Sequence, residues 1–467
     1  MKKRFAAGAA CRPCLLPYNV CVTTSVAILG GGLAGLALAR KLKDAGLDSV
    51  VLEAQPSVGG LCRSLRSGAY SWDLGPHAFY SKDPAAMRHL RALPLKLRFL
   101  RRDVRVCHHG SGGRIHEVGY PFENGLCDLP LGHRLECVAG YWAAWNPRSE
   151  TGRYRNLKHW IEDGLGSGIS RRFMTPYNGK IWSVPLERVS MELVRRKIEP
   201  ERPWAILKNS VLGGSVGRAY QAEFVYPEQG AGAVPEALAA GLGGQVRTGW
   251  EVRRVERRED GWRVVSKSGE EVSARALVST IPVPEFLSAL DDPSLRRFVP
   301  AFSFNHTRFV LVGLKPGRPP ARFSSCQWVF FAGPEVFYRV SLPHNFTARP
   351  EALVAEITLA GESAGLGREE LLGRVVRDLA AAGLIGSESS VETAELHLEK
   401  YTYPIPTVGM PEARAELEER LASRQVRLLG RSGRWDYLNT DGVLEAVEAF
   451  WLAHEGWLRG RDGGRSA

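Results

Sequence analysis

One segment near the start of the chain, residues 26–60, restricts the fold more than any other. An apolar run at residues 26–29 leads into the string Gly-Gly-Gly-Leu-Ala-Gly at residues 30–35. A stretch with helical periodicity follows, and then a second apolar run at residues 49–52. This order of strand, glycine turn, helix and strand predicts a nucleotide-binding β-α-β unit.

Three glycines and one acid in this unit have separate expected roles. Gly30 allows a tight turn, and Gly32 lets backbone N–H groups approach a diphosphate at the helix N-terminus. Gly35 lets the helix pack closely on the strand. Glu53 lies eighteen positions after Gly35, at the end of the second strand. Its carboxylate can accept a hydrogen bond from an adenosine ribose and would repel a 2′-phosphate.

The string Gly-Gly-Leu-Cys-Arg-Ser at residues 59–64 narrows the choice of cofactor. It resembles the second phosphate and flavin contact of the FAD-dependent amine oxidase and UDP-galactopyranose mutase superfamily. Nicotinamide dehydrogenases usually lack such a string. The resemblance therefore implies FAD, not NAD.

Length and charge set wider limits. With 467 residues, 44% of them hydrophobic, the chain is long enough for two or three domains that each bury a core. The net charge of +12 is compatible with nucleic acid, an anionic membrane or an anionic substrate. The dense arginine stretch at residues 88–105 is interrupted by leucines. It is typical of a solvated amphipathic face or of a positive rim that steers a nucleotide diphosphate, and we expect no nucleic-acid partner.

The eight cysteines are scattered along the chain. Only Cys11 and Cys14 have a metal-type spacing, and they lack partners, so no metal site is predicted. The scatter fits reduced thiols and a cytoplasmic location. The sequence contains no run of 18 uncharged apolar residues, so no transmembrane helix is predicted. Residues 1–21 lack the continuous apolar segment of a secretory signal. We expect them to be a loose tail or a mis-called start before Val22.

Nucleotide-binding patterns recur in three separated places, which predicts a mixed α/β fold with a discontinuous, Rossmann-like FAD-binding domain. We assign to this domain residues 22–124, 224–299 and 401–459. The later parts include a hairpin at residues 252–255 and 262–265, a strand at 276–282 and a strand at 426–430 that leads to the last helix.

Two insertions separate these parts. Residues 125–223 predict a helical insertion, with helical periodicity at residues 157–169 and 186–196. Residues 300–400 predict an antiparallel β-sheet that forms a substrate domain, with strands at 307–314, 326–331, 336–342, 352–359 and 395–401. We expect a disordered tail at residues 460–467.

The loop at residues 73–81, Asp-Leu-Gly-Pro-His-Ala-Phe-Tyr-Ser, contains the first candidate for chemistry. A lone histidine is more often structural. The loop resembles the Asp-x-Gly-x-His-x-x-x-Ser loop of UDP-galactopyranose mutases, above all the eukaryotic type, which lies against the flavin. This implies that Gly75 and His77 contact FAD and that His77 responds to its redox state.

The string Phe-Met-Thr-Pro-Tyr-Asn-Gly-Lys-Ile-Trp at residues 173–182 resembles a segment of the same mutases. Taken alone, the string also fits an aromatic-rich buried turn. The resemblance implies a substrate wall in which Asn178 contacts the sugar or its phosphate.

The string Tyr-Pro-Phe-Glu-Asn at residues 120–124 resembles the mutases' Tyr-Pro-Phe-Gln-Asn, which borders the uracil base. The resemblance makes Phe122 and Glu123 substrate candidates. Glu123 replaces a glutamine, and a carboxylate accepts but does not donate a hydrogen bond. Arg153 and Arg155 lie near the position of a nucleotide-contacting arginine in that family.

Within the predicted sheet, Trp328 and Phe330 precede the string Phe-Tyr-Arg at residues 337–339. In the mutases a Trp-x-Tyr pair precedes the same string, whose arginine binds the diphosphate. Arg339 fits this role, because a guanidinium can grip phosphate oxygens in a bidentate manner. Phe330 replaces the tyrosine, which removes one phosphate hydrogen bond.

The densest resemblance lies in the third nucleotide-binding part. Residues 401–407 resemble the mutases' Tyr-Pro-x-Pro-Thr, and residues 430–441 resemble their Gly-Arg-x-Gly-x-Trp-x-Tyr string. The resemblance implies that Tyr403, Arg431 and Tyr437 hold the diphosphate. A glycine-rich strand end that opens a helix is also an anion site on physical grounds.

The expected FAD contacts are spread over all three parts. They are Gly30, Gly32, Leu33, Ala34, Gly35, Glu53, Ala54, Gly60, Leu61, Arg63, Gly75, His77, Val252, Gly430, Asn439 and Asp441. Asn439 or Asp441 can cap the last helix as well as contact the flavin.

The resemblance implies a nucleotide-sugar mutase that interconverts the pyranose and furanose forms of a UDP-galactose-like substrate. Reduced FAD serves as covalent catalyst, with NADPH or NADH as possible reductant, and His77, Arg339 and Arg431 are the catalytic candidates. Two alternatives stay open. One is an FAD-dependent oxidoreductase of the amine oxidase or protoporphyrinogen oxidase type, and the other is a non-catalytic flavin-binding scaffold. The departures at Glu123, Thr175 and Phe330 leave the base and the sugar open.

Overall fold

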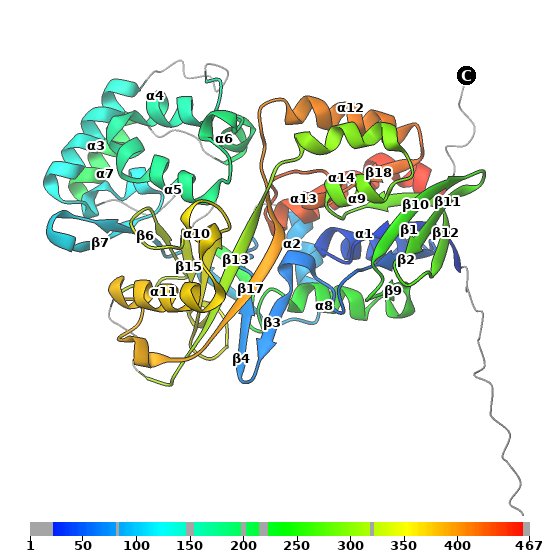
Figure 1. Cartoon of the computed structure of the whole chain (residues 1–467), viewed down its shortest axis with the longest axis horizontal. Coiled ribbons are helices and arrows are strands. Elements are labelled where there is room, and N and C mark those ends of the chain that lie inside the picture. Colours follow the sequence, from blue (N-terminus) through cyan, green and yellow to red (C-terminus); the bar gives the residue numbers. More distant parts are fainter. Residues whose placement is uncertain are drawn as a thin grey trace, which may run out of the picture.

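The computed structural model describes residues 22–80, 84–145, 154–197, 202–213, 223–317 and 322–460 (Figure 1). Two seven-stranded sheets organise these residues. The first lies on the right of Figure 1 among the helices α1, α8, α9 and α14, and the second lies beside it, below a group of helices. Three groups of predicted features lie outside the described residues: the predicted N-terminal tail 1–21 with Cys11 and Cys14, Arg153, and the predicted C-terminal tail 460–467 apart from residue 460.

The first sheet has a parallel centre. Its strands are β1 (Val22–Leu29), β2 (Ser49–Leu52), β9 (Val246–Arg247), β10 (Val252–Arg258), β11 (Gly261–Ser266), β12 (Glu271–Ser279) and β18 (Val426–Leu428). In β1, Ile28 pairs with Val51 on one side and with Val278 on the other. The three separated parts of the chain thus meet in one sheet, since β18 pairs with β12 in parallel.

Both faces of this sheet are buried. Val26 and Ile28 lie in one core cluster, whereas Ala27 and Leu29 lie in another. A parallel strand covered on both faces needs an unbroken apolar run, which is what residues 26–29 supply. The helices associated with this sheet are α1 (Leu33–Asp44), α8 (Ala233–Ala240), α9 (Val283–Ala289), α12 (Met410–Ala422), α13 (Gly430–Gly433) and α14 (Thr440–Leu458).

The second sheet runs in the order β17 (Val391–Pro404), β13 (Phe304–Leu314), β16 (Ala352–Thr358), β15 (Arg339–Ser341), β14 (Trp328–Phe331), β6 (Val104–His109) and β7 (Ile115–Gly119). All pairings are antiparallel except that of β14 with β6. The predicted strands within residues 300–400 are present, with different ends. Helices α10 (Glu362–Gly365) and α11 (Arg368–Ala381) belong to the same part.

Two boundaries of this sheet differ from the sequence interpretation. Residues 104–119 were assigned to the FAD-binding part, but β6 and β7 extend the second sheet. Without them, the apolar strand β14 would be an exposed edge with unpaired backbone groups. At the other side, β17 continues past residue 400 to Pro404, so Tyr403 lies on the second sheet, opposite Asn305.

The helical insertion contains α3 (Leu131–Ala144), α4 (Leu157–Ile169), α5 (Thr175–Ile181), α6 (Glu192–Lys197) and α7 (Pro203–Leu212). Helix α4 has the predicted bounds, and the Asn156 side chain caps it by accepting from the His159 N–H at 3.0 Å. A π-helical turn, Ser170–Met174, joins α4 to α5.

The single helix predicted at residues 186–196 is wrong. It is divided into a 3₁₀ turn, Leu186–Arg188, and the short α6. Between them, Val189 is extended and fully buried. Its carbonyl accepts from the Leu157 N–H at 2.9 Å, and it forms a bridge to Thr407. These long-range bonds use backbone groups that a continuous helix would need for itself.

The remaining elements connect the two sheets. They are the hairpin β3 (Ser64–Ser67) and β4 (Tyr70–Asp73), helix α2 (Pro84–Arg91), and the pair β5 (Leu97–Arg101) with β8 (Glu223–Pro227). Across the described ranges, no helix combines the length and the apolar character needed to cross a bilayer.

Candidate functional site: a glycine-lined cofactor cradle and an arginine–tyrosine cluster

The glycine turn after β1 is tied to the end of β2 by Glu53. Gly30 has a φ of +102°, a conformation that other residues rarely adopt. The Glu53 carboxylate accepts from the Gly31 N–H at 2.6 Å and from the Gln55 N–H at 2.8 Å. A carboxylate offers about four lone-pair positions, so Glu53 keeps capacity for a ribose hydroxyl while it orders the turn.

The N-terminus of α1 offers space for an anion. A Cβ added to Gly32 would meet no atom within 4 Å, whereas one added to Gly35 would lie 2.1 Å from the Gly30 carbonyl oxygen. Gly35 is therefore needed for packing, and Gly32 faces open space at a helix N-terminus. Backbone N–H groups and the helix dipole favour a phosphate at such a position.

A second glycine pair lies against the first turn. The Gly59 N–H donates to the Gly31 carbonyl oxygen at 2.8 Å, and Gly59 and Gly60 both have positive φ. Arg63 donates to the Gly60 carbonyl oxygen at 2.7 Å and forms an ion pair with Glu399. Arg63 thus joins the cradle to the second sheet.

The third part of the chain closes the cradle. Gly430 opens α13 with a φ of +80°, and a Cβ there would lie 2.6 Å from the Ala34 Cβ. The Thr440 hydroxyl, in the first turn of α14, donates to the Ala78 carbonyl oxygen at 2.7 Å. Asn439 occupies the N-cap position without a side-chain capping bond.

The other predicted FAD residues have varied settings. Leu33 and Ala34 are buried in α1, and Asp441 is buried in α14. Ala54 is exposed after β2, Leu61 is half-buried, and Val252 opens β10. Val252 lies two residues after Trp250, whose backbone N–H donates to the Glu53 carbonyl oxygen at 2.8 Å. Taken together, the cradle residues fit a dinucleotide that carries a diphosphate.

A buried network fixes the loop that carries His77. Asp73, only 2% exposed, accepts from the Tyr226 hydroxyl at 2.7 Å and the Ala231 N–H at 3.0 Å. It also forms an ion pair with Arg349 at 2.9 Å. The loop therefore starts from a rigid point.

His77 itself is half-buried and neutral at pH 7. Burial lowers its pKa to about 4, with Asp73 opposing this shift and the Arg431 and Arg339 guanidinium groups adding to it. Its Nε2 lies 3.1 Å from the Leu74 carbonyl oxygen. Because a carbonyl only accepts, Nε2 carries the proton and Nδ1 is left as an acceptor.

Arg339 is held by a buried carboxylate. Its Nε and Nη2 donate to Glu356 at 2.6 and 2.7 Å, and Nη2 lies 3.1 Å from the Tyr403 hydroxyl. The Glu356 side chain is 1% exposed and that of Arg339 is 18% exposed. Tyr338 also donates to Glu356, at 3.0 Å. The guanidinium is therefore fixed, and its Nη1 has no hydrogen-bond partner among the described residues. A Cβ added to Gly75 would lie 3.0 Å from the Arg339 Nη2, so the loop backbone passes close to the guanidinium.

Arg431 lies over two stacked tyrosines. The Tyr403 and Tyr437 rings are 5.7 Å apart and nearly parallel. The guanidinium of Arg431 lies 5.4 Å from the first ring and 4.5 Å from the second. Its Nη groups donate to the Leu438 and Thr402 carbonyl oxygens at 2.7 and 2.9 Å. Burial raises the pKa of Tyr403 to about 12, so this phenol keeps its proton as a donor.

Asn178 orients a tryptophan against this pair. Its side chain donates to the Met174 carbonyl oxygen at 2.7 Å and accepts from the Trp182 indole N–H at 3.0 Å. The Trp182 ring lies 6.1 Å from both Tyr403 and Tyr437. In this structure Asn178 thus acts on the cluster through Trp182.

A series of stacked rings lies next to the cluster. Phe122 stacks on Phe173 at 4.9 Å, and Phe173 stacks on Tyr177 at 4.9 Å. Phe330 packs edge-on against Tyr177 at 5.2 Å and lies 4.8 Å from Tyr120. Phe122 is 1% exposed and lies in the core.

Other substrate candidates lie apart from the cluster. The Trp328 ring packs against Phe224 and Phe346 at 5.8 and 6.5 Å. Arg155 is exposed on the helical insertion. Burial raises the pKa of the Tyr120 phenol to about 12; Arg102 opposes this shift, and the half-buried Glu123 adds to it.

Sequence reasoning missed two charged members of this site. Arg102 is only 9% exposed, lies 5.5 Å above the Tyr120 ring, and hydrogen-bonds Tyr80. Glu356 is the partner of Arg339. No local pattern distinguishes Arg102 from its exposed neighbour Arg101, and Glu356 lies in an ordinary strand pattern.

These features define a flavin-type dinucleotide cradle beside an anion-binding arginine–tyrosine cluster. The chain matches the model of the flavin containing amine oxidoreductase family over residues 33–420, and it belongs to that family. The family implies FAD as the bound cofactor. Reduced UDP-galactopyranose mutase has the same fold, with a TM-score of 0.84 and 24% identity over 92% of this chain and 96% of that one.

Oxidases are also similar. A candidate protoporphyrinogen oxidase from Exiguobacterium sp. 255-15 matches 92% of this chain and 99% of its own, with a TM-score of 0.70 and 17% identity. Protoporphyrinogen oxidase 1, chloroplastic, of Arabidopsis thaliana is 24% identical over 299 residues. That match covers 56% of this chain and spans about half, 53%, of the relative's length.

Proposed function

We propose that this protein is an FAD-dependent nucleotide-sugar mutase that interconverts the pyranose and furanose forms of a UDP-galactose-like substrate. One observation carries the proposal. Arg339, Arg431, Tyr403 and Tyr437 form one cluster of cations and phenols beside the His77 loop. Such a cluster suits a diphosphate, because guanidinium and phenol groups are donors for its oxygens.

Within the cluster the residues divide the work. Arg339 is fixed by Glu356 and offers Nη1 to a phosphate oxygen, while Tyr403 offers its phenolic proton. Arg431 contributes charge from above the tyrosines, and Arg102 adds a third guanidinium on the Tyr120 side. Residues that hold the leaving diphosphate close to the sugar would let it return after the sugar has closed into the other ring form.

Reduced FAD, when bound, would supply the nucleophile for the anomeric carbon. The protein then needs no attacking side chain of its own. Cys62 is a buried thiol close enough to Arg431 to be influenced by its charge. Burial and Asp73 raise its pKa to about 12 despite the opposing Arg431, which leaves it protonated and unreactive. His77, neutral and with Nδ1 as acceptor, can take a hydrogen bond at the cofactor edge without adding charge.

A second candidate is an FAD-dependent oxidoreductase that removes hydride from its substrate. The sequence similarity to protoporphyrinogen oxidase favours it. Oxidase sites of this superfamily are usually apolar, and the arginines and phenols around Tyr403 favour an anionic substrate instead. The non-catalytic scaffold gains no support from a site with three guanidinium groups.

The proposal is tested by a screen of nucleoside diphosphate hexoses against the dithionite-reduced holoenzyme, with pyranose-to-furanose conversion as the readout. We expect conversion of at least one sugar nucleotide and no activity before reduction; NADPH or NADH replaces dithionite if either is the physiological reductant. Inactivity with every hexose contradicts the mutase. Rapid flavin reduction by a tetrapyrrole or amine in anaerobic stopped flow would establish the oxidase instead.

A further inference from the structure

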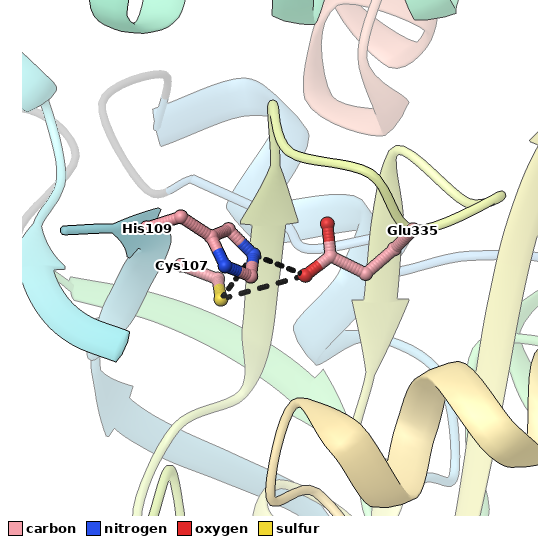
Figure 2. Close-up of side chains that lie close together, drawn as sticks. All are labelled: Cys107, His109 and Glu335. Carbon is pink, nitrogen blue, oxygen red and sulfur yellow. Dashed lines mark hydrogen bonds and ion pairs between the residues drawn. The ribbon is translucent and has the colours of Figure 1, made fainter. Parts of the chain in front are cut away.

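Three side chains with metal-ligating atoms converge near the second sheet, away from the arginine–tyrosine cluster. Cys107 and His109 are two positions apart on β6, so their side chains lie on the same face of that strand. Glu335 lies in the connection between β14 and β15. Figure 2 shows the three side chains pointing toward one another.

The donor atoms are close together. His109 Nε2 lies 2.6 Å from Glu335 Oε1, and the Cys107 sulfur lies 4.0 Å from that nitrogen and 3.9 Å from that oxygen. A nucleophilic relay would have the acid on one ring nitrogen and the thiol on the other. Here a single nitrogen, Nε2, faces both partners. The three donor atoms therefore converge on one point, which is the arrangement that a shared metal ion needs.

Burial gives a second observation. Cys107 is 2% exposed and Glu335 is 6% exposed, and Glu335 Oε2 has no hydrogen-bond partner among the described residues. A buried carboxylate oxygen without a partner is costly, and a cation is one way to satisfy it. The His109 side chain is 30% exposed, which leaves an entry path from solvent and room for a water ligand.

We propose that Cys107, His109 and Glu335 bind a divalent transition-metal ion, with Zn²⁺ as the best match. Thiolate, imidazole and carboxylate together are typical zinc ligands, at about 2.0 to 2.3 Å from the metal. Tetrahedral ligands at these lengths are about 3.3 to 3.8 Å apart. On metal binding, the distance between His109 Nε2 and Glu335 Oε1 must therefore increase by several tenths of an ångström. The distances from the Cys107 sulfur to these two atoms must decrease by a similar amount.

Proton balance follows from the donors. The Cys107 thiol loses its proton to solvent and binds as thiolate, and Nε2 of His109 binds through its lone pair with any proton on Nδ1. Burial and Glu335 raise the pKa of the Cys107 thiol, whereas Arg322 and Lys180 lower it. The thiolate and the carboxylate together offset the two charges of the ion.

The site would connect to the arginine–tyrosine cluster through the chain. Lys180 donates to the Glu335 carbonyl oxygen at 2.6 Å, and Arg339 follows Glu335 by four residues. A bound ion would fasten this connection to β6 and so stabilise the strand that carries Arg339.

The test uses the full-length holoenzyme, free of affinity tags and washed with a chelator. Titration with Co²⁺ should saturate at about one equivalent, with a thiolate-to-cobalt charge-transfer band in the difference spectrum and tetrahedral d–d bands to the red of the flavin absorption. Zn²⁺ should displace the cobalt signal and raise the melting temperature. Cys107→Ser and Glu335→Gln should each weaken binding by more than about 100-fold.

Two matched variants serve as controls, with normal flavin content as the check on folding. Cys326→Ser removes another buried cysteine of the core cluster that contains Cys107. His133→Gln removes one histidine of the pair His108 and His133, whose Nε2 and Nδ1 atoms lie 3.0 Å apart. Both should bind one equivalent of Co²⁺ as the wild type does. Failure of the wild type to give the thiolate band would overturn the proposal, as would its persistence in Cys107→Ser.

Discussion

The Glu356 carboxylate determines where the Arg339 guanidinium lies. The pair is bidentate, and its carboxylate is only 1% exposed, so the buried carboxylate depends on the guanidinium for its compensation. A buried charge that loses its partner is strongly destabilising, whereas an exposed ion pair contributes little.

Glu356→Gln should therefore lower the free energy of unfolding by about 3 kcal/mol, because the amide leaves the guanidinium uncompensated. Chemical denaturation of the holoenzyme measures this. Glu416→Gln removes a half-exposed carboxylate between Arg297 and Arg420, and should change stability by less than about 0.5 kcal/mol. Equal effects of the two substitutions would show that the buried pair has no special weight.

The proposed role of Arg339 in nucleotide binding predicts a different result. Arg339→Lys keeps the charge beside Glu356 but loses the planar fork of donors, so the fold should persist while affinity for UDP falls about tenfold or more. Titration of UDP against the flavin difference spectrum measures the Kd. Arg297→Lys, at the surface, is the control. Unchanged affinity in Arg339→Lys would remove this residue from the nucleotide site.

His77 predicts a pH dependence. Its pKa falls from an ordinary 6.5 to about 4 in the folded protein, because burial disfavours the charged ring. Between these values the unfolded chain binds a proton that the folded chain does not, so stability is lost as pH falls from about 6.5 toward 4. His77→Gln should show a shallower loss between pH 6.5 and 5 in denaturation curves. Parallel curves for both proteins would mean that His77 titrates normally.

At the scale of elements, the junction of β1 and α1 separates two uses of glycine. Gly35 lies against the Gly30 carbonyl oxygen, and its role is packing. Gly32 has ordinary dihedral angles and faces open space, so its role must concern what enters that space.

Gly35→Ala should destabilise the apoprotein, because a methyl group cannot fit 2.1 Å from a carbonyl oxygen. Gly32→Ala should leave the melting temperature of the apoprotein nearly unchanged and weaken FAD binding, since the methyl group would meet the diphosphate. Thermal unfolding and flavin-fluorescence titration measure the two effects. Gly132→Ala, in open space on α3, should affect neither. FAD binding that is as tight in Gly32→Ala as in the wild type would contradict a diphosphate position beside Gly32.

At the scale of the whole molecule, features encoded by neighbouring residues could be predicted from the sequence, whereas features that depend on distant contacts could not. The β-α-β unit and the glycine turns are encoded by neighbouring residues, and the structure has them where the sequence placed them. The pairing of β6 with β14 and the bridge of Val189 to Thr407 depend on partners more than a hundred residues away, which periodicity does not contain. Glu356 is only 17 residues from Arg339, but it lies opposite Arg339 on the neighbouring strand β16, a pairing that periodicity does not indicate. The burial of Arg102 likewise has no local signal. Family resemblance supplied Tyr403, Arg431 and Tyr437, which indeed lie together.

A mutase of this kind requires that the flavin serve the protein without net oxidation or reduction of the substrate. An anaerobic assay of the reduced holoenzyme, following furanose formation by chromatography and flavin absorbance in the same sample, tests it most directly. We predict many turnovers of product per enzyme while the flavin stays reduced, and no product from the oxidised enzyme. Absence of product with every sugar nucleotide would contradict the mutase activity. So would product formed only as an equal amount of flavin changes its redox state.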